Sequence, residues 1–146
     1  MRSMPTHIAT LLSARQAYDE AAPGDHVLGW KLDAAQRGEL LRRLRPSHAR
    51  TVADHVTLKP GVSRHAQLPC ETEGTIVGRA DDGQGVQAFV VQIAGSTERP
   101  GGGTYHITWS LGKGRRPKES NDVIAARGWE PVDPAIPVRL LPAVFQ

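Results

Sequence analysis

One four-residue pattern occurs twice in the chain, as His55-Val56-Thr57-Leu58 and as His106-Ile107-Thr108-Trp109. Each copy places a histidine, a β-branched residue, a threonine and a large apolar residue in order. Side chains alternate between the two faces of a β-strand, so the histidine and threonine of one copy share a face. The pattern predicts two strands that bury Val56 and Ile107 and present two imidazoles and two hydroxyls to one cleft.

These side chains suit chemistry at a phosphate diester. Two imidazoles can supply one base and one acid near neutral pH, and the hydroxyls can hold the non-bridging oxygens. A single His-x-Thr is common in ordinary half-buried strands, which is the alternative interpretation. Two copies, each followed by a basic loop that contains glycine (residues 59–61 and 112–116), favour a functional site.

Length and composition predict one domain in a reducing compartment. The 146 residues suffice for a single core, which we expect over residues 25–146, after an N-terminal segment, 1–24, that is helical or partly disordered. Cys70 is the single cysteine, so no internal disulfide can form. No apolar run has the length of a membrane span and no signal peptide is recognisable, so we expect a soluble, cytoplasmic protein.

Apolar periodicity and turn residues predict a mixture of strands and helices. The predicted elements are a short helix over 6–18, a strand at 26–32, a helix from its N-cap Asp33 to Leu44, a strand at 55–58, a hairpin of 75–80 with 86–93, a helix from about 118 capped by Ser120 or Asn121, and a terminal strand at 137–145. Pro142 favours an edge position for the terminal strand. Residues 100–103 read as a flexible connector. Hairpin connections dominate, so the predicted fold class is α+β.

The basic residues gather in two clusters. Their members are Arg37, Arg42, Arg43, Arg45 and Arg50 in the first, and Lys113, Arg115, Arg116 and Lys118 in the second. We interpret the first as a solvated helix face. The second follows the His106 copy directly, which favours a loop that faces phosphate.

The paired His-x-Thr pattern resembles the signature of the two-histidine phosphoesterase superfamily. The second copy, the glycine-containing loop after it, Lys118-Glu119-Ser120-Asn121 and the terminal strand are similar to the cyclic phosphodiesterase domain of plant and fungal tRNA ligases. The resemblance implies a compact bilobal α+β fold with antiparallel sheets that flank a central cleft. It also implies hydrolysis of 2′,3′-cyclic phosphates without a metal ion, which leaves a 2′-phosphate. The close spacing of the two copies and the absence of ligase and kinase domains depart from the family.

Carried over to this chain, the family's catalytic residues are His55, Thr57, His106 and Thr108. The resemblance implies that His106 is the base that activates water and that His55 is the acid. The near symmetry of the two copies leaves the opposite assignment open. Either assignment predicts a bell-shaped pH dependence, because one imidazole must be neutral and the other protonated.

Five further residues are candidates for contact with the substrate: Lys59, Arg64, Lys113, Tyr105 and Trp109. The two aromatic residues alternate with His106 and Thr108 along the strand, so core packing is the stronger interpretation for them. The remaining histidines show no spacing typical of a zinc site, and we expect neither metal nor cofactor.

The expected partner is a nucleoside 2′,3′-cyclic phosphate or an RNA terminus. Two alternatives stay open. One is a phosphodiesterase that acts on another cyclic or 2′-5′-linked signalling nucleotide, and the other is an RNA-end binding module without turnover. Oligomeric state cannot be predicted from this sequence.

Overall fold

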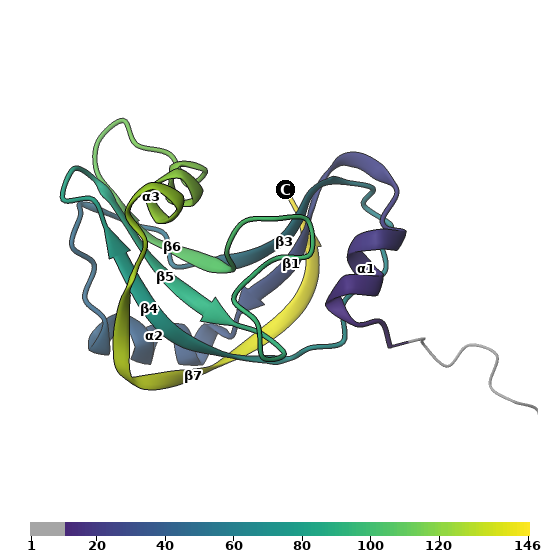
Figure 1. The fold of residues 1–146 in the computed structure, drawn as a ribbon, viewed down its shortest axis with the longest axis horizontal. Coiled ribbons are helices and arrows are strands. Elements are labelled where there is room, and N and C mark those ends of the chain that lie inside the picture. The colour runs from purple at the N-terminus through teal and green to yellow at the C-terminus, as the bar shows by residue number, and fades with distance from the viewer. Residues whose placement is uncertain (1–10) are drawn as a thin grey trace, which may run out of the picture.

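The computed structural model describes residues 11–146, which form an α+β fold of three helices and seven strands (Figure 1). The elements follow in the order α1 (Ala14–Glu20), β1 (Pro23–Leu32), α2 (Ala34–Arg43), β2 (Arg50–Thr51), β3 (His55–Val62), β4 (Glu73–Asp81), β5 (Val86–Gln92), β6 (His106–Leu111), α3 (Glu119–Arg127) and β7 (Glu130–Phe145). The predicted α+β class is therefore confirmed.

The strands form one continuous antiparallel sheet, where two sheets in two lobes were expected. Their order is β2-β6-β3-β1-β7-β4-β5, and β5 pairs with β6 as well, so the sheet closes on itself. Strand β7 makes this closure possible, because residues 140–145 pair with β1 and residues 130–139 pair with β4. The two motif strands, β3 and β6, are neighbours in this ring.

Strand β7 also corrects the expectation of an edge strand. It lies between β1 and β4 and is central to the sheet. Pro142 is tolerated there because it pairs with Trp30 of β1 at a point beyond the residues that pair with β4. The missing N–H of proline therefore costs no hydrogen bond on the β4 side.

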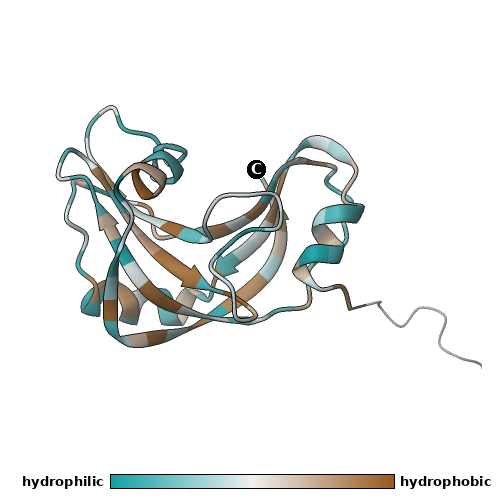
Figure 2. Ribbon diagram, in the orientation of Figure 1, coloured by the Kyte–Doolittle hydropathy of each residue, from teal (hydrophilic) through white to brown (hydrophobic). Residues whose placement is uncertain are grey.

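The main core gathers aromatic side chains from the strands. Trp109 packs edge-on against Phe89 with ring centroids 5.1 Å apart, and Trp30 packs in the same way against Tyr105 at 5.8 Å. The buried indole N–H of Trp109 donates to the Leu44 carbonyl at 2.7 Å, which satisfies its polar group. Figure 2 shows hydrophobic stretches along β5 and β7, whereas the loop between β6 and α3 is hydrophilic.

The predicted hairpin and the predicted helix after Asp33 are both present, and side-chain hydrogen bonds at their ends explain them. Asp33 accepts a hydrogen bond from the Gln36 amide at 3.0 Å and caps α2. In the β4–β5 turn, Asp81 accepts from the Gly83 amide and Asp82 from the Gln84 amide. Both elements follow from side chains that bond to backbone two or three residues away.

The two remaining helices differ from the expectations. Helix α1 begins later than the predicted 6–18, after a capping box in which Ser13 and Gln16 bond reciprocally, and residues before 11 lie outside the described residues. Helix α3 begins at Glu119 with no side-chain cap, and Ser120 is buried inside it. Within residues 11–146, no helix has the length and apolarity needed to cross a membrane.

Candidate active site

The two copies of the pattern meet where β3 pairs with β6. The pairing is antiparallel and joins Val56 to Ile107, which are both completely buried. In that register His55 lies beside Thr108 and Thr57 beside His106, all on the face opposite the core. Antiparallel pairing therefore relates the two copies by a local twofold arrangement, with one imidazole and one hydroxyl at each end.

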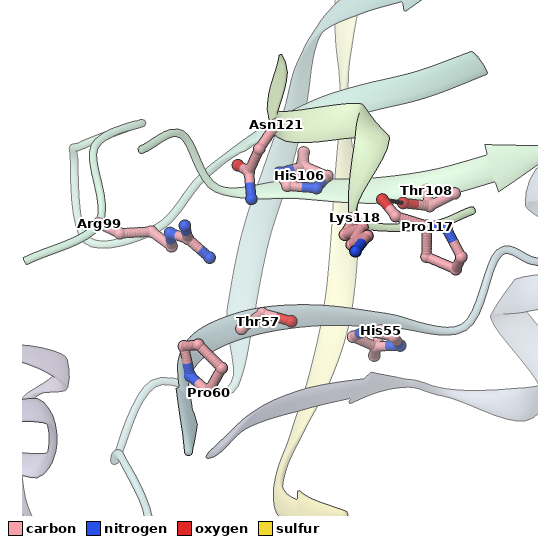
Figure 3. Close-up of a pocket in the computed structure, with 9 residues that line it drawn as sticks. All are labelled: His55, Thr57, Pro60, Arg99, His106, Thr108, Pro117, Lys118 and Asn121. Atoms are coloured by element: carbon pink, nitrogen blue, oxygen red, sulfur yellow. Dashed lines mark hydrogen bonds between the residues drawn. The ribbon is translucent and has the colours of Figure 1, made fainter. Parts of the chain in front are cut away.

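All four motif residues line one cavity of about 240 Å³ (Figure 3). Its lining residues are His55, Thr57, Pro60, Arg99, His106, Thr108, Pro117, Lys118 and Asn121. Within the described part of the chain, none of these is a carboxylate, whereas arginine, lysine and two histidines are present. The cavity is therefore suited to an anion.

His106 is held by backbone and is partly buried. Its Nδ1 lies 2.7 Å from the Thr104 carbonyl oxygen, which can only accept, so Nδ1 carries the hydrogen. Burial lowers the pKa of His106, and the charges of Arg99 and His55 lower it further against the opposing effect of the Thr104 hydrogen bond. The ring is thus neutral at pH 7, with Nε2 as its basic atom.

His55 is held by side chains. Its Nδ1 donates to the Asp54 carboxylate at 3.0 Å, and its ring packs against Phe145 with centroids 4.8 Å apart. Burial raises the pKa of Asp54, but hydrogen bonds from Lys31 and His55 outweigh it and the net pKa is lowered. Asp54 is therefore ionised at neutral pH, and its carboxylate fixes the hydrogen of His55 on Nδ1.

The two threonines also differ. Thr57 is half-buried, and its hydroxyl has no hydrogen-bond partner among residues 11–146. The Thr108 hydroxyl donates to the Pro117 carbonyl at 3.2 Å and lies 2.8 Å from the hydroxyl of the fully buried Ser120. Thr57 is therefore free to donate to a bound anion, while Thr108 ties β6 to the start of α3.

The predicted substrate-binding cations lie outside the cavity lining. Lys59 donates to the Tyr18 carbonyl at 2.9 Å and lies 4.3 Å from the centre of the Tyr18 ring, so it anchors α1. Arg64 is exposed beside His65, and Lys113 is exposed in the loop after β6. Of the second basic cluster, Lys118 alone lines the cavity.

Tyr105 and Trp109 belong to the core. Their exposed fractions are 3% and 0%. Burial raises the pKa of Tyr105 to about 12, in keeping with a neutral phenol inside the protein. A side chain with no exposed surface cannot contact a substrate, so their place corrects the substrate-binding assignment, and the core interpretation of strand alternation accounts for both.

Sequence reasoning missed several residues that shape the site. Asp54 directly precedes the first copy and was identifiable by its charge next to a histidine. Arg99 comes from the β5–β6 loop and had no local signal that tied it to either copy. Asn121 was interpreted as a helix cap, but it lines the cavity from the first turn of α3.

One other cluster could hold a metal ion within residues 11–146. His48, Asp81 and Asp82 place one ligand atom each within 4.8 Å of one another. These groups already have partners: His48 bonds to Asp81 at 2.9 Å, and Arg115 pairs with Asp82 at 3.0 Å. The cluster therefore ties the β4–β5 turn to neighbouring loops, and none of its members lines the motif cavity.

Comparison of the chain with protein-family models, with curated proteins and with solved structures finds no match.

Proposed function

We propose that the protein hydrolyses 2′,3′-cyclic phosphates on nucleotides or RNA ends by histidine acid–base catalysis, in the manner of the two-histidine phosphoesterases. One observation carries the proposal: two His-x-Thr strands pair so that both histidines line one cavity, each in a different electrostatic setting. A hydrolase needs both a proton acceptor and a proton donor at the same phosphorus. A module that only bound phosphate would need neither a proton acceptor nor a proton donor.

The cyclic diester is opened by water in a single displacement. His106 Nε2 takes a proton from the attacking water, and the new P–O bond forms opposite the ribose oxygen that leaves. The His55 imidazolium gives its proton to that ribose oxygen as the P–O bond breaks. The product is a phosphate monoester, and one proton has passed to His106 while another has left His55, so exchange with solvent restores both residues.

Donors around the phosphate stabilise the charge on its non-bridging oxygens. No residue of the described chain hydrogen-bonds to the Thr57 hydroxyl, and the Lys118 side chain lines the cavity. Donors that are already oriented cost little reorganisation when charge develops. Since no lining residue of the described chain is a carboxylate, the donor set does not suit a hard cation such as Mg²⁺. We therefore expect turnover without a metal ion.

The test is hydrolysis of the four nucleoside 2′,3′-cyclic monophosphates in the presence of EDTA, with 2′- and 3′-phosphate products separated. We expect metal-independent turnover to the 2′-phosphate, as the tRNA-ligase-like resemblance implies. A strong loss of activity with EDTA would contradict the mechanism. Turnover of other cyclic or 2′-5′-linked nucleotides alone would move the substrate assignment to that class.

A further inference from the structure

Arg99 lines one end of the cavity and belongs to neither copy of the pattern. Figure 3 shows its guanidinium directed at the cavity from the side of Thr57 and His106, whereas His55 and Thr108 lie at the other end. The four motif residues surround the position of the reacting phosphate. Arg99 therefore adds a cation beside that position rather than within it.

The guanidinium has no acidic partner. Among residues 11–146, no carboxylate lies within ion-pair distance of Arg99, whereas Lys31, Arg115 and Arg139 each pair with one or more carboxylates. Its Nε donates to the Gly102 carbonyl at 3.1 Å, which leaves both terminal NH₂ groups available. Burial lowers the pKa of Arg99, but an arginine remains charged in a protein. A half-buried cation without a carboxylate is suited to an anionic ligand.

The glycine-rich segment after Arg99, which the sequence predicts to be a flexible connector, forms a hydrogen-bonded turn that holds this side chain in the structure. The Arg99 amide donates to the Gly103 carbonyl at 3.0 Å, and the Gly102 amide donates to the Arg99 carbonyl at 3.0 Å. Gly103 has φ +87°, and a Cβ there would lie 2.7 Å from Nη2 of Arg99. At Gly101, a Cβ would overlap the Tyr18 hydroxyl of α1. A side chain at Gly103 would therefore displace the guanidinium, and one at Gly101 would displace the loop from Tyr18.

We propose that Arg99 binds a second phosphate of the substrate, the one on O5′ of the reacting nucleotide. The inference rests on the proposed function. A cyclic phosphate carries one negative charge, which the histidines, Thr57 and Lys118 already surround. The 5′-phosphate of the same nucleotide is attached to the ribose that carries the cyclic phosphate, so the two phosphates are one sugar apart. Guanidinium NH₂ groups match a phosphate through two parallel hydrogen bonds. The site is thereby selective for 5′-phosphorylated substrates.

The test compares adenosine 2′,3′-cyclic phosphate with the same compound carrying a 5′-phosphate. For the native protein we expect kcat/KM about tenfold higher with the 5′-phosphate, the size of one charge-assisted hydrogen bond. Arg99→Ala should remove this preference by raising KM for the 5′-phosphorylated compound, so that the ratio of the two kcat/KM values falls to about one. Lys113→Ala, which removes an exposed cation outside the cavity, is the matched control and should keep the preference.

Two outcomes would overturn the proposal. The first is equal kcat/KM for both compounds in the native protein. The second is an equal fall for both in Arg99→Ala, which would assign Arg99 to the reacting phosphate. If the native protein turns over neither compound, the proposed function fails, and calorimetric titration with adenosine 5′-monophosphate tests Arg99 by itself. Weaker binding in Arg99→Ala than in Lys113→Ala supports the subsite, and equal binding in all three proteins contradicts it.

Discussion

Strands β3 and β6 carry the same pattern, but their histidines have different hydrogen-bond partners. The partner of His55 is a side chain, and the partner of His106 is a backbone carbonyl. His55 donates to the Asp54 carboxylate at 3.0 Å, and His106 donates to the Thr104 carbonyl at 2.7 Å. The partner of His55 is thus a charged carboxylate, whereas His106 lies beside a neutral carbonyl and burial lowers its pKa. The comparison teaches that the pattern determines where the imidazoles lie, and that their neighbours give the two rings the different surroundings on which the proposed acid and base roles rest.

The largest expected effect follows loss of either ring. His55→Ala and His106→Ala should each lower kcat on a 2′,3′-cyclic phosphate by about a hundredfold or more, because each removes one of the two proton transfers. His65→Ala, at an exposed histidine of the loop after β3, is the matched control and should be near native. Near-native kcat in either motif variant, with a native circular dichroism spectrum, would refute the assignment of the site.

The two threonines should respond differently to substitution: Thr57 should affect activity, and Thr108 should affect stability. Thr57→Val removes a hydroxyl that no described residue uses, so we expect roughly a tenfold loss of kcat/KM with Tm unchanged. Thr108→Val leaves the buried Ser120 hydroxyl without its partner, which should cost about 1–3 kcal/mol of stability. Steady-state kinetics beside thermal denaturation measures both effects. Identical Tm values for the two variants would contradict the structural role of Thr108.

Asp54→Asn tests whether the carboxylate beside His55 contributes to the proposed proton transfer. The amide oxygen can still accept from Nδ1 of His55 but carries no charge, so we expect kcat at neutral pH to fall several-fold. Asp54→Glu, which keeps the charge, should recover part of the native kcat. A native kcat in folded Asp54→Asn would contradict a role for this pairing in the reaction.

The smallest effect concerns the acid limb of the native profile. Protonated His106 cannot accept a proton from water, so kcat/KM falls as the pH drops through the pKa of His106. Burial lowers that pKa from the ordinary 6.5, and activity should therefore persist to a lower pH than an exposed histidine would allow. A pH profile of kcat/KM locates the limb. A midpoint above 6.5 would show that His106 is not a buried base.

Sequence alone predicted the parts of the molecule that depend on short-range signals. The motif strands, the Asp33 cap and the β4–β5 hairpin each rest on residues a few positions apart. The alternation that placed Val56 and Ile107 in the core also brought four polar side chains to one cavity. Side-chain alternation in a strand is a local property, so it can be predicted without knowledge of the rest of the fold.

Features that depend on distant contacts were missed. The burial of Ser120 follows from packing α3 against β4 and β5, with its hydroxyl bonded to Thr108 of β6. The closed sheet follows from β7 pairing with two strands far away in the chain. Arg99 reaches the cavity from the β5–β6 loop, which lies against Tyr18 of α1. No spacing rule connects these residues, so only the folded chain reveals that they belong together.

The proposed role of His106 as the base is tested most directly by NMR of the imidazole nitrogens across a pH titration of the free protein. We expect His106 to be neutral at pH 7 with its hydrogen on Nδ1, where the Thr104 carbonyl accepts it, and to titrate below 6.5. His55 should also carry a hydrogen on Nδ1, bonded to Asp54. A doubly protonated His106 at pH 7, or a neutral His106 with its hydrogen on Nε2, would contradict its role as the base.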